Sequence, residues 1–364
     1  MRFLLDTEQR AFARSLDAML TAADTPAAVR AWSTGDHAAG RAVWSRLADA
    51  GVFAPAVPEA YEGMGPLPVE LAVAFVELGR HAVPGPLVET VAACVLLAGL
   101  EESGPAKRLL PALASGETVA TVALPGGSPY VLDGDAAEVQ LTVRGTGDDT
   151  ALHLTRAPVH APAPHHSPDP APRQSPDPAA RPRPRPARTD PAPRPSLDPA
   201  RRLARPLPCG EVLATGPHVT RAAADALAWA RLATAAQALG VGLALLERTV
   251  AYVRQRTQFG VPVGSFQAVK HRLADAKVAL EFARPLLFGA ALTLHPADLA
   301  AAKVTACEGA YATARTALQL HGAIGYTAEY DLSLWLTKAR ALRTAWGTPA
   351  QCRAEVLRGG GRRS

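Results

Sequence analysis

Two short segments of this 364-residue chain carry residue types that a helical fold alone does not require. The first spans residues 254–267, RQRTQFGVPVGSFQ, and contains Arg256, Gln258, Phe259 and Gln267. A connection between two helices needs only about two to eight residues and none of these side chains. Together they offer a cation, amides and an aromatic face, which suit a planar ligand that carries phosphate. The alternative interpretation is a helical hairpin with a polar turn.

The second segment is QLHGAIGY at residues 319–326, in which two glycines follow a predicted helix. Glycine breaks the helix and lets bare backbone approach a ligand closely. The same pattern is also an ordinary way to end a helix. Its spacing alone therefore favours neither a structural nor a functional interpretation.

Other chemistries lack the residues that they need. Hydrolysis by a serine nucleophile of the G-x-S-x-G type is excluded because the sequence has no such elbow. Metal catalysis needs clustered ligands. His165 and His166 fall in a proline-rich stretch and His321 stands alone, so we predict no metal site.

The cysteines and the apolar runs indicate the compartment. Cys94, Cys209, Cys307 and Cys352 are scattered singly, which predicts reduced thiols in a cytoplasmic protein rather than a disulfide scaffold. The N-terminus lacks the apolar core of a secretory signal. The sequence contains no run of eighteen apolar residues, so we predict no membrane-spanning helix.

One segment explains most of the formal net charge of +5. Residues 158–195 hold 14 of the 33 prolines, with six arginines and three aspartates. With almost no large apolar residue, this insert cannot offset its ordering entropy, so we expect it to be disordered. Because the rest of the chain carries only a small surplus, a nucleic-acid surface is not indicated. The insert is either a proline-rich ligand or tether, or an expanded loop without function, and the second is favoured.

Hydrophobic periodicity predicts a helical part followed by a β part. Residues 1–115 are expected to be helical, with helices that include Val88–Leu100 and Ala106–Ala114. From Thr118 the period changes to two, which predicts strands in TVATVAL, EVQLTVRG and DTALHLTR.

From Val219 the chain is expected to be helical again. Apolar residues from Phe266 to Leu287 are spaced alternately by three and four, as in a heptad seam. Further helices are expected at about Ala297–His321 and Asp331–Ala345. Long antiparallel helices of this kind predict a four-helix bundle.

The predicted fold class is therefore mostly α with a small middle β domain. Its expected parts are an N-terminal helical domain (1–116), a reduced β domain that contains the insert (117–216), a C-terminal four-helix bundle (217–358) and a disordered tail (359–364).

Four longer stretches give the sequence a family resemblance. They are MRFLLDTEQRAFARSL, VPEAYEGMGPLPVELAVAFVELGRHAVPGPLVET, RQRTQFGVPVGSFQAVKHRLADA and LQLHGAIGYTAEYDLSLWLTKARAL. In order and over nearly the whole chain they resemble the acyl-CoA dehydrogenases. The resemblance implies the same three-part fold, and dimers or tetramers that bind FAD between subunits.

The resemblance also implies site residues. Arg256, Gln258 and Phe259 would touch the FAD pyrophosphate and flavin of a neighbouring subunit, and Gln267 would meet the adenosine end. FAD would be lined from the other chain, mainly by backbone, by Gln319, His321, Gly322 and Ala323. Thr348 would contact the flavin. An acyl-CoA or acyl-carrier thioester as substrate, and electron-transfer flavoprotein as electron acceptor, are implied in the same way.

The sequence departs from the family where a glutamate should take the α-proton of the thioester. The three positions at which members carry that glutamate look like Trp346, Ala230 and Gln237 here. The family's flavin-holding loop of the β domain is also replaced, by ALPGGSPYVL. The catalytic residue is therefore unassigned.

Three hypotheses follow. The chain is one subunit of a hetero-oligomeric dehydrogenase whose partner supplies the base. Alternatively, it is an active homo-oligomer that uses another base, such as Glu308 or Glu329, although each is more typical of a surface salt bridge. Otherwise it is a non-catalytic flavin- or CoA-binding member, or a helical scaffold. The acyl group cannot be inferred from the sequence.

Overall fold

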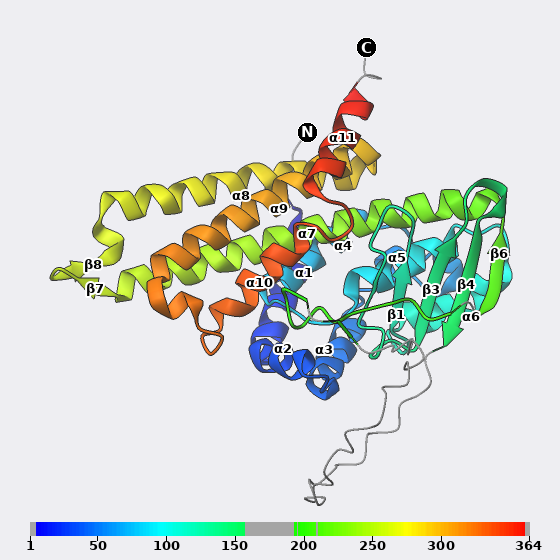
Figure 1. The fold of residues 1–364 in the computed structure, drawn as a ribbon, viewed down its shortest axis with the longest axis horizontal. Coiled ribbons are helices and arrows are strands. Elements are labelled where there is room, and N and C mark those ends of the chain that lie inside the picture. Colours follow the sequence, from blue (N-terminus) through cyan, green and yellow to red (C-terminus); the bar gives the residue numbers. More distant parts are fainter. Residues whose placement is uncertain (1–4, 157–192, 195, 209, 361–364) are drawn as a thin grey trace, which may run out of the picture.

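The structure is a computed structural model that describes residues 5–156, 193–194, 196–208 and 210–360. A group of N-terminal helices, a small sheet and a long C-terminal helical bundle follow one another along the chain (Figure 1). This order confirms the fold class expected from the sequence.

The N-terminal part is built from helices whose apolar faces meet in one core. They are α1 (Thr7–Thr21), α2 (Thr25–Ser33), α3 (Ala38–Asp49), α4 (Pro68–Arg80), α5 (Leu87–Ala98) and α6 (Ser103–Ala114). The Asp6 carboxylate begins α1 by accepting a hydrogen bond of 2.8 Å from the Gln9 N–H, a capping-box arrangement. Ten of the twelve residues of α5 are buried, because the helix lies between α7 and the sheet.

The middle part is a four-stranded sheet in the order β1 (Ala120–Ala123), β3 (Val139–Arg144), β4 (Ala151–Arg156), β6 (Glu211–Thr215). The β1–β3 pair is parallel and the other pairs are antiparallel. A separate short pair joins β2 (Val131–Leu132) to β5 (Leu203–Ala204). The disordered state expected for residues 158–195 concerns a segment that lies almost wholly outside the described residues.

The C-terminal part contains α7 (Pro217–Gln255), α8 (Gln267–Thr293), α9 (Pro296–His321), α10 (Leu332–Leu342) and α11 (Pro349–Gly360). A hairpin of β7 (Thr257–Gln258) and β8 (Val261–Pro262) joins α7 to α8 and lies at the end of the bundle away from the sheet (Figure 1). We call it the 257–262 hairpin.

Two boundaries expected for this part differ in the structure. The helix expected at about Asp331–Ala345 spans Leu332–Leu342, and the turn that follows it contains positive φ angles of 56° at Trp346 and 127° at Gly347. A further helix, α11, follows and includes Gly359 and Gly360. These two residues were expected to belong to a disordered tail at 359–364. Residues 361–364 of that tail lie outside the described residues.

One long helix, α7, is apolar on average although no run of eighteen apolar residues occurs in it. It has an 18-residue window with a mean hydropathy of 1.3, long and apolar enough to cross a membrane. However, 89% of that window is buried inside the protein, against α4, α5, α8 and α9. Helix α7 is therefore the core helix that joins the N-terminal and C-terminal parts.

Candidate functional site

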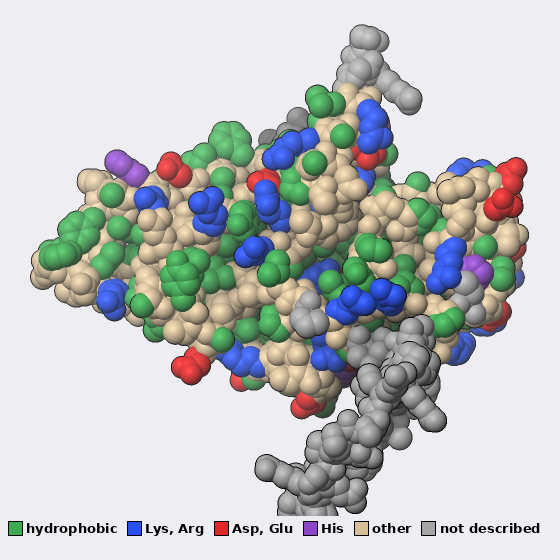
Figure 2. Space-filling model, viewed as in Figure 1, with side chains coloured by type: hydrophobic (Ala, Val, Ile, Leu, Met, Phe, Trp, Pro, Cys, Tyr) green, Lys and Arg blue, Asp and Glu red, His purple; other side chains and the backbone are tan. Residues whose placement is uncertain are grey.

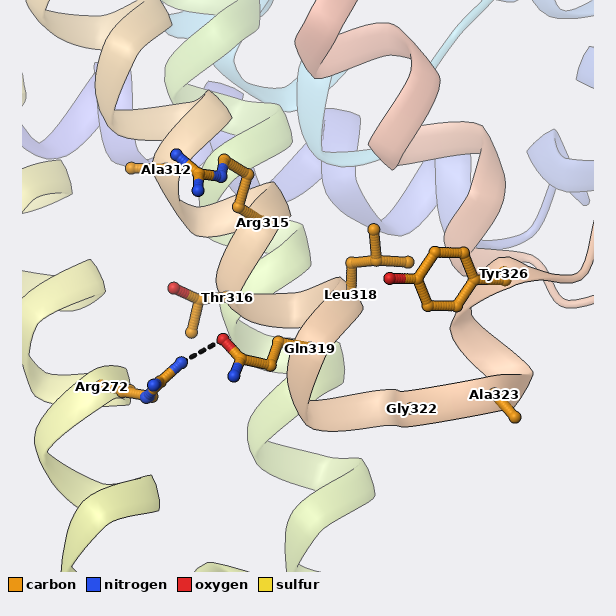
Figure 3. Close-up of a pocket in the computed structure, with 9 residues that line it drawn as sticks. All are labelled: Arg272, Ala312, Arg315, Thr316, Leu318, Gln319, Gly322, Ala323 and Tyr326. Atoms are coloured by element: carbon orange, nitrogen blue, oxygen red, sulfur yellow. Dashed lines mark hydrogen bonds between the residues drawn. The ribbon is translucent and has the colours of Figure 1, made fainter.

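A cavity of about 790 Å³ lies at the end of the bundle, between the start of α8 and the end of α9; we call it the bundle-end cavity. Figure 3 shows its lining, which includes Arg272, Arg315, Gln319, Gly322, Ala323 and Tyr326. The side chains of Arg272 and Gln319 point toward each other, and the guanidinium donates a hydrogen bond to Gln319 Oε1. Two guanidinium groups and an amide are groups that can bind an anion such as a phosphate.

Gly322 opens the floor of the bundle-end cavity. It ends α9 with a φ of 65°, a left-handed conformation that glycine adopts without strain. A Cβ added at this position would meet nothing within 4 Å, so the backbone faces open space. A ligand can therefore reach the peptide groups of the following 3₁₀ turn (Gly322–Tyr326).

His321 supports this turn rather than lining the cavity. Its ring is buried, shares a hydrogen bond of 2.8 Å between Nδ1 and the Ala317 carbonyl, and stacks on Tyr252 with ring centroids 4.2 Å apart. Burial lowers the pKa of His321 below its ordinary value, which favours the neutral ring. Of the predicted residues in this segment, Gln319, Gly322 and Ala323 line the cavity.

The residues predicted in segment 254–267 lie at the same end of the bundle as the bundle-end cavity, but they do not line that cavity. The Tyr252 hydroxyl near the end of α7 donates a hydrogen bond of 3.2 Å to the His321 carbonyl, which ties the two corners together. Arg256, Gln258 and Gln267 are exposed, and the Phe259 ring is 93% exposed. Within one chain these side chains therefore face outward.

A second cavity, of about 480 Å³, lies between the sheet and the bundle; we call it the inter-domain cavity. The replaced loop of the β domain lines it through Gly127, Ser128, Pro129 and Tyr130, which follow β1. The turn after α10 lines the opposite side through Trp346, Gly347 and Thr348. The predicted flavin-contacting residue Thr348 also caps α11, since its hydroxyl accepts a hydrogen bond of 3.3 Å from the Gln351 N–H.

Buried cations hold the Trp346–Gly347 turn against the bundle. Arg231 Nε donates a hydrogen bond of 3.3 Å to the Trp346 carbonyl. Lys303 Nζ donates to the carbonyls of Gly347 and, at 3.0 Å, of Arg343. Because these donors hold the turn, the bulky Trp346 side chain faces the inter-domain cavity.

The three positions at which the family carries its base lie in different places in the structure. Only Trp346 lines the inter-domain cavity. Ala230 and Gln237 are buried within α7, and Gln237 Oε1 has no hydrogen-bond partner among the described residues. The other two candidates lie elsewhere, since Glu308 pairs with Arg343 at 2.8 Å and Glu329 is exposed.

The sequence analysis missed Glu89 on α5, which among the described residues is the one acidic group that lines the inter-domain cavity. Arg201 from the segment before β5 lies beside it, with 3.9 Å between Arg201 Nη2 and Glu89 Oε1. The sequence does contain a signal, because Glu89 is the only charged residue in the mostly apolar helix Leu87–Ala98. A charge in such a helix is uncommon unless it is paired or has a function.

Buried polar groups lie behind the inter-domain cavity. Lys338 Nζ and Asp198 Oδ2 are 3.9 Å apart, and both side chains are almost fully buried. Asp133 is completely buried, and its Oδ1 accepts a hydrogen bond of 3.2 Å from the Arg202 N–H. Desolvation raises the pKa of Asp133 to about 8, so its charged form opposes folding.

Asp133→Asn is expected to stabilise the protein at neutral and alkaline pH. The pKa of Asp133 rises from 3.8 to about 8, so the penalty of ionisation is absent near pH 4 and complete above about pH 8. Asparagine keeps the acceptor oxygen and tolerates the positive φ of 51°. The gain in the free energy of unfolding should grow from pH 4 to pH 8, to at most about 6 kcal/mol at about 1.4 kcal/mol per pKa unit, and is measured by thermal unfolding of both proteins. A constant difference over this range would contradict the assignment.

One cluster of side chains has the composition of a metal site, although the sequence predicts no cluster of metal ligands. Among the described residues, ligand atoms of Asp17, Glu77 and His81 lie within 4.8 Å of one another. Existing contacts account for them, because Arg80 Nε lies 3.3 Å from Glu77 Oε2 and His81 Nε2 lies 2.9 Å from Asp17 Oδ1. We assign no metal here.

Comparisons with known proteins cover most of the chain. The family models "Acyl-CoA dehydrogenase, N-terminal domain" and "Acyl-CoA dehydrogenase, C-terminal domain" match residues 6–117 and 220–360. "Acyl-CoA dehydrogenase IpdE2" of Mycobacterium tuberculosis is 32% identical over 355 residues, which cover 96% of each chain.

Solved structures share the fold. A variant of the "Tcur3481-Tcur3483 steroid ACAD" matches with a TM-score of 0.78 and 25% identity over 98% of this chain and 99% of that chain. The glutaryl-coenzyme A dehydrogenase complex with glutaryl-CoA matches with a TM-score of 0.80 and 20% identity, over 100% of this chain and 98% of that one. The chain belongs to the acyl-CoA dehydrogenase family.

Proposed function

We propose that this chain is a subunit of an FAD-dependent enzyme that oxidises the Cα–Cβ bond of an acyl thioester, and that it relies on a partner subunit for the base. The single observation that carries the proposal is Trp346. The chain keeps a cavity suited to a dinucleotide, but an indole lines the inter-domain cavity where the family resemblance places the catalytic carboxylate.

The residues at the end of the bundle fit FAD, the family's cofactor. Arg272 and Arg315 would bind the pyrophosphate, Gln319 would add an amide, and the open backbone at Gly322 would admit close contact. The volume of about 790 Å³ lies within the ordinary range for cofactor sites. When bound, FAD accepts the hydride that leaves the β-carbon of the substrate.

The exposed residues of the first segment fit a site that is completed across a subunit interface. Hydrophobic side chains lie over the 257–262 hairpin and along α8 (Figure 2). Exposed members are Phe259, Val261, Phe266, Val278, Phe282 and Leu286. Such patches mark protein–protein contacts. Arg256, Gln258, Phe259 and Gln267 would then reach the FAD of the neighbouring subunit, while Gln319, Gly322 and Ala323 would line FAD mainly through backbone and His321 would support their turn.

The base and the oligomeric state follow from the same argument. The α-proton of the thioester needs a carboxylate acceptor, and none of the three family positions provides one here. The similar steroid ACAD structure carries the names of two components, Tcur3481 and Tcur3483. We therefore favour a hetero-oligomer with a paired homologue over a homo-oligomer.

The substrate class and electron acceptor complete the proposal. An acyl-CoA or acyl-carrier thioester is the substrate, and electron-transfer flavoprotein reoxidises the flavin. The buried free thiols of Cys94, Cys307 and Cys352 accord with a cytoplasmic location. The alternative favoured by Trp346 is a non-catalytic flavin- or CoA-binding or scaffold member. It predicts no turnover in any assembly.

Arg272→Ala is expected to reduce FAD retention about tenfold to a hundredfold, because a charge-assisted hydrogen bond contributes about 1.5–3 kcal/mol. The measurement is FAD per chain after purification and dialysis. Arg358→Ala, at an exposed position of α11, is the control and should retain FAD like the wild type. Equal FAD content in both variants would contradict the placement of the cofactor, and a colourless wild type would favour the scaffold alternative.

A further inference from the structure

Glu89 is buried in the wall of the inter-domain cavity without a hydrogen-bond partner for one oxygen. The residue is 3% exposed and lines the cavity from the first turn of α5. Among the described residues, no group hydrogen-bonds to Glu89 Oε2. A buried polar atom without a partner is costly, so its position at a cavity wall points to a ligand.

The nearest cation is too far from Glu89 to form a short charge-assisted hydrogen bond with the carboxyl group. An ionised carboxylate beside a guanidinium normally forms hydrogen bonds of about 2.7–2.9 Å. Here 3.9 Å separates Glu89 Oε1 from Arg201 Nη2, and Arg201 also lines the cavity. Burial raises the pKa of Glu89, although Arg201, hydrogen bonds from the Glu89 backbone and the Trp346 side chain, and Lys338 oppose this effect.

Charged groups approach Glu89 from several elements, and Arg201, Lys338 and Asp133 interact with it electrostatically. Arg201 approaches from the segment before β5, and Lys338 from α10. Asp133 follows β2 and interacts with Glu89 electrostatically, and Asp198 lies 3.9 Å from Lys338. A hydrogen bond from the Trp346 side chain to the Glu89 carboxyl group lowers the pKa of Glu89. Asp133 titrates near pH 8, so any test by pH must separate it from Glu89.

The other walls of the cavity favour a flat ligand. Tyr130 from the β1–β2 loop and Trp346 from the turn after α10 both line it. Aromatic rings of this kind pack against the face of a conjugated group. Ser128 and Gln351 add polar groups to the same lining.

We propose that Glu89, in its protonated form, donates a hydrogen bond to a carbonyl oxygen or ring nitrogen of a conjugated group in the inter-domain cavity, with Arg201 as a second donor. The identity of that group rests on the proposed function. Two ligands could supply such a hydrogen-bond acceptor, namely the isoalloxazine ring of FAD and the carbonyl of the thioester. Glu89 is therefore a ligand-binding residue that the family's base positions do not include.

The test compares Glu89→Gln and Glu89→Leu with the wild type in the oligomer as purified and stripped of flavin. FAD binding is measured by fluorescence quenching and butyryl-CoA binding by calorimetry, in separate arms from pH 5 to pH 9. Glu247→Gln is the control, because it removes the charge of an exposed glutamate that pairs with Arg80. Asp133→Asn supplies a background in which Asp133 cannot titrate.

The sign of the pH effect follows from the donor role. The proton is present below the pKa of Glu89 and is lost above it, so wild-type affinity should fall as the pH rises. Glutamine keeps a donor at every pH, so Glu89→Gln should bind without this fall. Glu89→Leu should bind about tenfold more weakly at low pH, since one hydrogen bond contributes about 1–1.5 kcal/mol. The wild-type fall should persist in Asp133→Asn and in Glu247→Gln.

The separate measurements of FAD binding and butyryl-CoA binding distinguish the possible outcomes. An effect on FAD alone assigns the acceptor to the flavin, and an effect on butyryl-CoA alone assigns it to the thioester. Wild-type binding that is unchanged in Glu89→Leu, or that strengthens as the pH rises, overturns the inference while leaving the proposed function intact. Binding of neither probe by the wild type overturns both. If Glu89→Leu does not fold, the different pH profiles of the wild type and Glu89→Gln still decide.

Discussion

Trp346→Glu is expected to give the flavin-loaded chain an ability to remove the α-proton of an acyl thioester that the wild type lacks. Residue 346 lines the inter-domain cavity, and Arg231 and Lys303 hold its turn through backbone carbonyls. The substitution therefore places a carboxylate in a turn whose supports do not depend on the indole. A positioned general base contributes about 10²–10⁴-fold to such a step. Exchange of the α-proton in deuterated water, followed by mass spectrometry of the thioester, measures it.

Trp346→Gln is the matched control, because it makes nearly the same change in volume and provides no base. Both variants adopt the positive φ of 56° that tryptophan has, so any strain there is shared. Trp346→Glu should exchange the α-proton at least about tenfold faster than Trp346→Gln. Equal rates in two folded, FAD-loaded variants would show that residue 346 does not face the α-carbon.

Gly240→Ala is expected to cause the largest loss of stability, since it disrupts the crossing of α4 and α7. A Cβ at Gly240 would overlap the Val76 carbonyl, and a Cβ at Gly79 would overlap the Gln237 carbonyl. These contacts are with backbone, so neither helix can give way by moving a side chain. Overpacking of this kind costs about 1–3 kcal/mol per site or more.

Thermal unfolding of Gly240→Ala and of the double variant with Gly79→Ala provides the measurement. A cost of about 3 kcal/mol would lower the melting temperature by roughly 6–12 °C in a domain of ordinary size. Gly104→Ala in α6 is the control, because a Cβ there meets nothing within 4 Å. It should leave the melting temperature unchanged or raise it slightly. A Gly240→Ala variant as stable as Gly104→Ala would mean that the helices do not cross here.

The sequence predicts the helices better than their ends. Periodicity places a helix at about 297–321, and α9 spans Pro296–His321. The pattern persists over many residues, so an error at one of them changes little. Between α10 and α11 the chain turns, with positive φ angles at Trp346 and Gly347, and no periodicity reports such a turn.

The sequence likewise predicts one part of the candidate site better than the other. The motifs at 254–267 and 319–326 are local, so the sequence identifies them, and the fold brings both to one end of the bundle. The inter-domain cavity joins α5, the β1–β2 loop and the turn after α10. Glu89 and Trp346, which are far apart in the sequence, meet there only through tertiary packing. Sequence patterns could therefore flag Glu89 as unusual but could not assign it to the cavity.

The most direct test of the central claim is reduction of bound flavin by acyl-CoA, measured as loss of visible flavin absorbance. It is made on the tagged chain purified from its native host, and on the same chain produced alone and supplied with FAD. The account predicts that the native preparation contains a homologous second subunit and is bleached by an acyl-CoA, whereas the chain alone is not. Bleaching by the chain alone would contradict the account, and so would a native assembly that binds no flavin.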